Sequence, residues 1–258
     1  MKRIISSIAA AAVVITSLTA CLDVDSLVAQ LPSTDISAPA QEPIRVNPNA
    51  PAAQLLEELT ISDPMQNMHL YNRDVQFPHW MAPEQQYGWD ASANTNCDVR
   101  WYQLFLQSTT QEWDDETSCV IGGDYFWTDP YGWPNEDTGE IEYLTSDDPS
   151  LFDIDHIVSL GEAWRTGAEN LSQEERTSLA NDPLNVIATY SKANQAKSDN
   201  SAELFLATSG EGFYFIAVGN PIRCEIATRY TQVKHKYNLT ITEGDYQALA
   251  QVLNNECA

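Results

Sequence analysis

Basic residues are scarce in this chain of 258 residues, which has 13 Lys and Arg against 37 Asp and Glu and a formal net charge of -24. A general nucleic-acid binder neutralises many phosphates with Lys and Arg, so the composition argues against that class. The acidity is uneven: residues 22–150 have a balance of -20, with 23 acidic and three basic residues, and residues 151–258 a balance of -6, with 14 and eight. A less negative cleft in the second part can still bind a polyanion, while the acidity elsewhere favours solubility.

Several common catalytic signatures are absent. The four His residues form no His-Glu-x-x-His helix, and the sequence has no Gly-x-Ser-x-Gly elbow, no P-loop and no Cys-x-x-Cys spacing. The sequence also has no internal repeat. These absences leave little support for a zinc protease, an α/β-hydrolase or a P-loop nucleotide hydrolase.

The chain begins with the pattern of an export signal. Two basic residues precede an apolar run over 8–14, which is too short to span a bilayer as a final anchor, and small residues follow at 19–20. The sequence Leu-Thr-Ala-Cys resembles a bacterial lipoprotein box, in which Cys21 carries the lipid; an ordinary secretory cut is the alternative. We therefore expect a signal peptide over 1–20 and an exported protein, either anchored in the outer membrane or at the cell surface, or secreted.

The remaining cysteines support this compartment. Cys97, Cys119, Cys224 and Cys257 form an even set, which in an oxidising environment favours two disulfides over a metal site. Three pairings exist. We favour Cys97 with Cys119 and Cys224 with Cys257 because each closes a short local loop, and the crossed pairings stay open.

Composition divides the rest of the chain into a tether and one domain. Residues 21–55 are rich in Pro, Ala and Ser and cannot bury enough apolar surface to fold, so they are expected to form a disordered tether. Residues 56–258 suit a single domain. Six of the seven Trp lie within 72–133, where they would either pack a small core or expose a platform for a glycan or a protein.

Hydrophobic patterning predicts alternating strands and helices in the second part. Ser172 and Glu175 have the spacing of a capping box, and Asn181-Asp182-Pro183 would end that helix. The expected elements are helices over 98–107, 172–180 and 190–199 and strands over 119–127, 151–160 and 184–189.

The most informative residues lie on these elements. Asp155 and His156 are in the strand over 151–160, Asn185 is in the next strand, and Asn194 and Lys197 are at i and i+3 on one face of the following helix. Together they could supply a metal ligand, a proton acceptor and a phosphate contact. Neighbouring residues on a regular strand face opposite ways, so Asp155 and His156 can share a substrate only if the strand ends or bends there.

These residues, in the order strand, break, strand and helix, resemble an HNH-type endonuclease with Asn in place of the last His. The chain also resembles exported bacterial members of that group through Cys-Asp-x-Arg, Asp-Pro-Tyr, Glu-Ala-Trp-x-x-Gly-Ala and a closing Cys…Arg…Val-Lys-His…Cys segment. The resemblance covers about 87–257. It implies an α+β fold in which a ββα-metal core, about 151–200, is embedded in additional helices and irregular aromatic-rich loops and stapled by disulfides.

The resemblance also implies a role for each residue of the set. His156 would be the general base that deprotonates the attacking water, and Asp155 and Asn194 would hold the metal. Asn185 would brace the loop that carries the base, and Lys197 would contact phosphate.

Other basic residues are candidate phosphate contacts. Arg100 matches the upstream Arg of the motif, and Arg229 and Lys234 belong to a basic segment near the end of the chain that could form a phosphate-binding strip. One departure from the family pattern is Ser159, which stands where Pro is usual.

The expected cofactor is a divalent cation. Carboxylate and amide oxygens suit Mg²⁺, with Mn²⁺, Ca²⁺ and Zn²⁺ as alternatives. The expected function is that of a metal-dependent, largely sequence-nonspecific endonuclease that cleaves DNA, or RNA, outside the cytoplasm. The alternative is a non-catalytic surface lipoprotein that binds a glycan or a protein through its aromatic-rich region.

Overall fold

Two paired strands and the helix that follows them form the centre of the structure, a computed structural model that describes residues 44–207 and 216–257. Strand β5 (Phe152–His156) pairs antiparallel with β6 (Val186–Tyr190), with Phe152 opposite Tyr190 and His156 opposite Val186. Helix α7 (Ser191–Lys197) begins directly after β6. This is the predicted ββα arrangement, and the α+β fold class is confirmed.

A helical insertion separates the two strands along the chain. It contains α5 (Leu160–Arg165), the short turn η4 (Ala168–Asn170) and α6 (Gln173–Asn181). The predicted capping box is present, because Ser172 accepts from the amide of Glu175 and the Glu175 carboxylate accepts from the amide of Ser172. The helix therefore begins where the sequence predicted.

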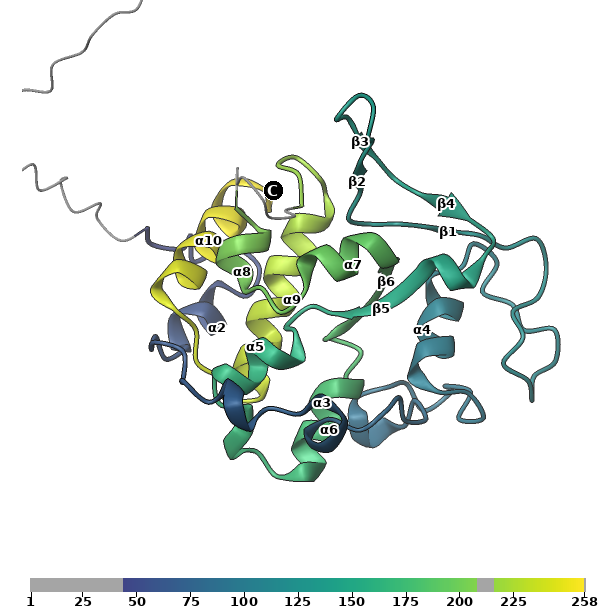
Figure 1. Cartoon of the computed structure of the whole chain (residues 1–258), viewed down its shortest axis with the longest axis horizontal. Helices are drawn as coiled ribbons and strands as arrows, with labels where there is room; N and C mark the ends of the chain where they lie inside the picture. The colour runs from purple at the N-terminus through teal and green to yellow at the C-terminus, as the bar shows by residue number, and fades with distance from the viewer. Residues whose placement is uncertain (1–43, 208–215, 258) are drawn as a thin grey trace, which may run out of the picture. The chain divides into compact units, whose positions relative to one another are not determined.

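One hydrophobic core joins the helices at the two ends of the described chain. Helices α9 and α10 pack against each other and against α2 and α8 (Figure 1). Their buried residues share one cluster with Ile157, Val158 and Ile187 of the central region. The bounds are α2 (Ala53–Glu58), α8 (Ala202–Phe205), α9 (Ile222–Lys236) and α10 (Glu243–Asn255).

A second core lies on the other face of the strand pair. Phe152, Ile154, Val186 and Ala188 alternate along β5 and β6 and pack with the aromatic-rich region and α4. Asp153 and Asp155 consequently project from the opposite face of β5. The bounds in this region are η1 (Met68–Leu70), α3 (Arg73–Gln76), η2 (Gln85–Tyr87), α4 (Val99–Gln107), β1 (Trp127–Thr128), β2 (Trp133–Pro134), β3 (Ile141–Glu142), β4 (Thr145–Ser146) and η3 (Pro149–Leu151).

Two expectations about local structure need correction. The strand predicted over 119–127 is irregular: only an isolated bridge at Ile121 and the start of β1 at Trp127 are extended and paired, and β1 pairs with β4. Residues 44–55, which were assigned to the tether, pack against α10. There Val46 is buried, and Asn254 donates to the carbonyl of Arg45.

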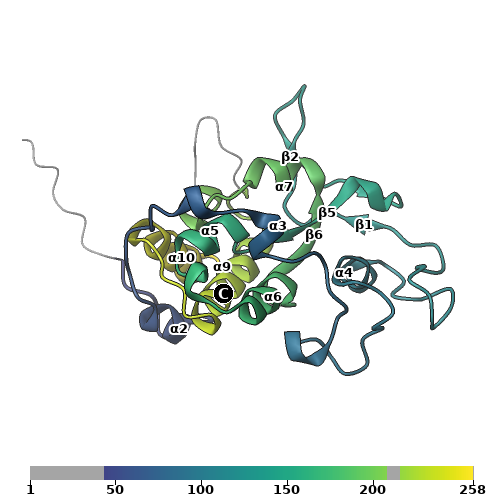
Figure 2. The ribbon, with the colours of Figure 1, turned by 60° about the horizontal axis from the view of Figure 1, so that its bottom comes forward.

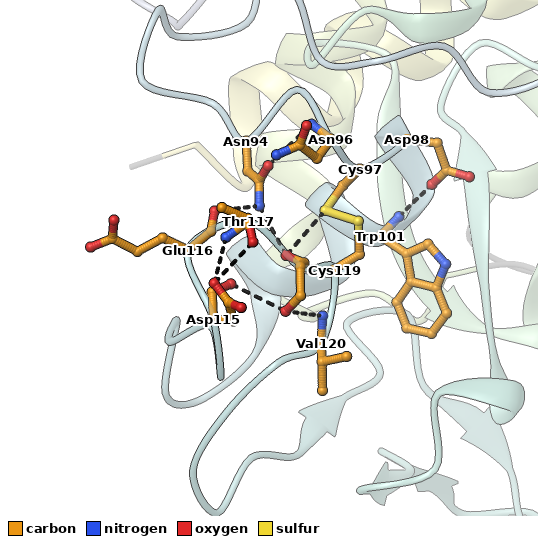
Figure 3. Close-up of a disulfide and its surroundings, with 11 residues drawn as sticks. Asn94, Asn96, Cys97, Asp98, Trp101, Asp115, Glu116, Thr117, Cys119 and Val120 are labelled. Carbon is orange, nitrogen blue, oxygen red and sulfur yellow. Dashed lines mark hydrogen bonds between the residues drawn. A yellow bond between two sulfur atoms is a disulfide. The ribbon is translucent and has the colours of Figure 1, made fainter.

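The predicted disulfide pairing is confirmed. Cys97 is bonded to Cys119 and Cys224 to Cys257. Figure 3 shows the first bridge beside the start of α4, next to the loop in which the Asp115 carboxylate accepts from Thr117. The predicted signal peptide, Cys21 and the tether before residue 44 lie outside the described residues. Within the described ranges, no helix has the length and apolar character needed to cross a membrane.

We predict that replacing Cys224 and Cys257 by Ser lowers the free energy of unfolding by about 3 kcal/mol, because the loop that the bridge closes gains freedom in the unfolded chain. Urea unfolding followed by circular dichroism measures this change. Oxidised wild type and the same protein under reducing conditions serve as the reference pair. An unchanged urea midpoint in the variant would contradict the expectation that this bridge stabilises the fold.

Candidate active site

Four of the predicted site residues, Arg100, Asp155, His156 and Asn194, line a cavity of about 610 Å³. Its wall is formed by the end of β5, the start of α5, α7, and the segment that contains α3 and Trp80. In Figure 2, α3 lies between α5 and β5. Asp155, His156 and Asn194 line this cavity, so the fold brings together the residues that the sequence placed on strand and helix.

His156 is held in one orientation by its two neighbours. Its Nε2 lies 2.9 Å from the carbonyl oxygen of Ala180, and its ring stacks on Trp80 with centroids 5.1 Å apart. A carbonyl only accepts hydrogen bonds, so Nε2 carries the proton and Nδ1 keeps a lone pair. Burial lowers the pKa of His156 to about 3, and the positive charges of Arg73 and Lys197 add to this effect. The imidazole is therefore neutral at pH 7.

The Asn185 side chain is hydrogen-bonded to the backbone that follows β5. Its Oδ1 accepts from the amide of Val158 at 2.8 Å, and its Nδ2 donates to the carbonyls of Val158 and Leu179 at 3.2 Å. These bonds fix the backbone next to Ser159, where the usual Pro would otherwise restrict it. Asn185 is fully buried, and its side-chain hydrogen bonds go to this backbone.

Lys197 and Asp155 form a buried ion pair. The Lys197 Nζ lies 3.1 Å from Asp155 Oδ1 and donates to the carbonyl of His156 at 2.8 Å, and the Tyr131 hydroxyl donates to Asp155 Oδ2 at 2.7 Å. Burial raises the pKa of Asp155, while the Lys197 ammonium and the Tyr131 hydrogen bond oppose that rise. The Lys197 side chain is 0% exposed. The expected contact between Lys197 and phosphate is therefore not supported by this arrangement.

Asp153 and Asn194 meet on the cavity wall. Both are half-buried, and Asn194 Nδ2 donates to Asp153 Oδ2 at 3.2 Å. If the Asn194 amide turns by 180°, its oxygen takes the place of its nitrogen, so that Asp153 and Asn194 could both offer oxygen to a cation bound between them. Asp155, the carboxylate that we expected to hold metal, has both oxygens engaged by Lys197 and Tyr131.

The oxygen atoms of Asp153 and Asn194 suit a hard divalent cation that takes few of its ligands from the protein. Among the residues that the structure describes, no group of three or more His, Cys, Asp or Glu gathers as a metal cage. Mg²⁺ is commonly held by one or two carboxylates, with water and substrate phosphate completing its shell. Asp153 and Asn194 fit that pattern, whereas a structural zinc site would need four protein ligands.

The other predicted phosphate contacts separate into two groups. Arg100 lines the cavity, although its NH2 group also donates to the carbonyls of Pro149 and Phe152. Arg229 donates to three carbonyls between residues 183 and 186. Lys234 is fully buried and paired with Glu162. Neither Arg229 nor Lys234 lines the cavity, because their charges serve the packing of α9, which corrects the expectation of a basic strip there.

Asp153, Trp80 and Arg73 are among the cavity-lining residues that were not predicted as site residues. Asp153 shares a face of β5 with Asp155, so the two-residue period of a strand could have identified it. Trp80 and Arg73 also line the cavity. They are more than 70 residues from His156 along the chain, and no spacing in the sequence connects them with it.

Comparisons with known proteins found one family and one related protein that match this chain. The model of the family described as "GmrSD restriction endonucleases, C-terminal domain" matches residues 103–252, more than half of the chain. The chain is 29% identical over 227 residues to an uncharacterized secreted protein of Arthroderma benhamiae, covering 86% of this chain and 93% of that protein. No solved structure matches the chain.

We predict that Lys197→Ala lowers the free energy of unfolding by about 3 kcal/mol, because it leaves the buried Asp155 carboxylate without its cation. Lys192→Ala on the same helix is the matched control, since Lys192 has an exposed side chain and a surface ion pair with Glu136, and its effect should stay within about 0.5 kcal/mol. Urea titrations compare the two variants. Equal small losses would show that the buried pair does not stabilise α7 on β5.

Proposed function

Because the chain belongs to the family of GmrSD restriction endonuclease C-terminal domains, an HNH-type nuclease family, we propose that it is a metal-dependent endonuclease that hydrolyses phosphodiester bonds of nucleic acid outside the cytoplasm. The observation that carries this proposal is a neutral imidazole with a free lone pair on the wall of the cavity that Asp153 and Asn194 also line. This combination supplies a proton acceptor beside hard oxygen donors.

His156 is the proposed general base. Its Nδ1 takes a proton from the water that attacks phosphorus, and the Ala180 carbonyl, through its contact with Nε2, stabilises the imidazolium that forms. Trp80 on the ring face prevents rotation of the imidazole away from that water. The pKa of His156, which is low in the protein without substrate, rises when a negatively charged phosphate enters the cavity, because the phosphate stabilises the protonated ring.

Asp153 and Asn194 are the proposed metal ligands, with Asp155 behind them. A bound divalent cation, most suitably Mg²⁺, supplies charge stabilisation to the phosphate and the leaving oxygen. Asp155 adds negative charge to this side of the cavity and orients Tyr131 and Lys197. The three carboxyl and amide groups explain why an acidic protein can still bind a polyanion here once a cation is present.

The proposed substrate is DNA, or RNA, bound without strong sequence preference. The formal net charge of -24 predicts weak affinity and a steep dependence on salt, because an acidic exterior repels the polyanion. The two disulfides and the likeness to a secreted fungal protein support export. A lipid anchor at Cys21 rests on the sequence pattern.

The glycan-binding alternative has less support. Five of the six Trp residues over 72–133 pack in the second core: Trp89 and Trp127 are buried, and Trp113 stacks on Phe105 with centroids 4.0 Å apart. Their faces are used in packing, which leaves little aromatic surface for a sugar platform.

We predict that the purified protein nicks supercoiled plasmid with Mg²⁺ at low salt and that EDTA abolishes the activity. His156→Ala should lower the rate by about 100-fold or more, the usual contribution of a general base. His235→Ala is the matched control because His235 is an exposed residue of α9 that pairs with Glu58. A wild type that is inert with all of Mg²⁺, Mn²⁺, Ca²⁺ and Zn²⁺ would refute the proposed activity.

We further predict that Asp153→Ala and Asn194→Ala each weaken Mn²⁺ binding by about tenfold or more, since each removes a proposed ligand. Electron paramagnetic resonance of free Mn²⁺ measures the affinity without reference to catalysis. Asp63→Ala, which removes an exposed carboxylate away from the cavity, should bind as wild type does. Wild-type affinity in both site variants would exclude this ligand pair.

A further inference from the structure

The structure leaves the proposed nuclease without the phosphate contact that the sequence suggested. Lys197 is fully buried and engaged by Asp155 and the carbonyl of His156. To reach a substrate, the Lys197 ammonium would have to break its ion pair with Asp155. This would leave a buried carboxylate without a cation, at a high cost in free energy. A positively charged side chain that reaches the phosphate would add to the charge stabilisation that the proposed metal supplies, because negative charge accumulates on phosphate during hydrolysis.

Two arginines among the described residues line the cavity, and their surroundings differ. Arg100 is anchored: its NH2 group donates to two carbonyls, and its guanidinium lies 5.2 Å from the ring centroid of Trp101. Arg73 is exposed on α3. Over 44–207 and 216–257, no hydrogen bond or ion pair engages its guanidinium, which is therefore available to a ligand.

Arg73 also lies next to the proposed base. It lines the cavity together with His156 and Trp80, and the same three residues line a smaller adjoining hollow of about 60 Å³. A guanidinium in this position can reach a phosphate held in front of His156 and donate two parallel hydrogen bonds to it.

The backbone that carries Arg73 is fixed at both ends of α3. The Asn72 side chain accepts from the amides of Asp74 and Val75 at the start of the helix. At its end, the carbonyl of Gln76 accepts from Arg176 and Gln173, which belong to α6. The backbone from which the Arg73 side chain projects is therefore held in place, which lowers the entropy lost when the side chain binds a substrate.

From this we propose that Arg73 is a substrate-binding residue that contacts the phosphate at or next to the cut. The segment that carries Arg73 lies outside residues 103–252, the span that the family model matches, so this contact would be an addition by the N-terminal part of this chain. The inference rests on the proposed nuclease function and assigns to Arg73 the phosphate contact that Lys197 is too buried to make.

Binding and cleavage measurements on one set of variants test the proposal. Fluorescence anisotropy with a labelled DNA duplex and Ca²⁺, under conditions where no cleavage occurs, gives Kd as a function of salt, and plasmid nicking with Mg²⁺ gives kcat and KM. Arg73→Ala should raise Kd about tenfold and lower the slope of log Kd against log salt by about one, as expected for one lost phosphate contact. Arg73→Lys should recover part of the affinity, because lysine keeps the positive charge but cannot donate the two parallel hydrogen bonds of a guanidinium.

Arg45→Ala is the matched control, because Arg45 is an exposed arginine that lines a different hollow of the surface. It should leave the affinity, the salt slope and the nicking rate unchanged. If wild type nicks DNA but Arg73→Ala keeps wild-type Kd, slope and kcat/KM, the inference about Arg73 is overturned and the nuclease function stands. If wild type neither binds nor nicks DNA, the proposed function itself fails, and the inference fails with it.

Discussion

The buried pair between Lys197 and Asp155 is the interaction on which the geometry of the site depends. Moving two ions out of water costs on the order of several kcal/mol, and the cost is offset only when each finds close partners. Here Lys197 also bonds the carbonyl of His156, and Asp155 also accepts from Tyr131. One ammonium therefore ties α7 to the last two residues of β5, and this tie places Asn194 beside Asp153.

The proposed base is positioned by parts of the chain that are far apart in sequence. Trp80 covers one face of the His156 ring, the carbonyl of Ala180 contacts Nε2, and Asn185 braces the backbone that follows the histidine. Two of these contacts come from the helical insertion and from the turn between it and β6. The insertion between β5 and β6 is thus part of the site, because α6 supplies the carbonyl that selects the tautomer of His156.

Local patterns in the sequence predicted much of the fold. The capping box at Ser172 marked the start of α6, and hydrophobic patterning identified β5 and β6, because those signals depend on neighbouring residues. The favoured disulfides followed from short spacing. Burial of charge was not predictable in this way. Lys234 is paired with Glu162, 72 residues away, and Lys197 with Asp155, so only the tertiary structure shows that these ammonium groups serve packing. The positions of Arg73 and Trp80 also depend on tertiary structure, because the N-terminal segment that carries them packs beside the cavity. The sequence therefore did not identify them as site residues.

The central claim is that the cavity beside β5 and α7 receives a phosphodiester next to His156. A crystal structure of the His156→Ala protein with Mn²⁺ and a short DNA duplex tests this claim most directly, because anomalous scattering locates the cation independently of the DNA. The account predicts a phosphate in the cavity, with Mn²⁺ between that phosphate and the side chains of Asp153 and Asn194. A duplex bound on another face, or Mn²⁺ bound away from β5 and α7, would contradict it.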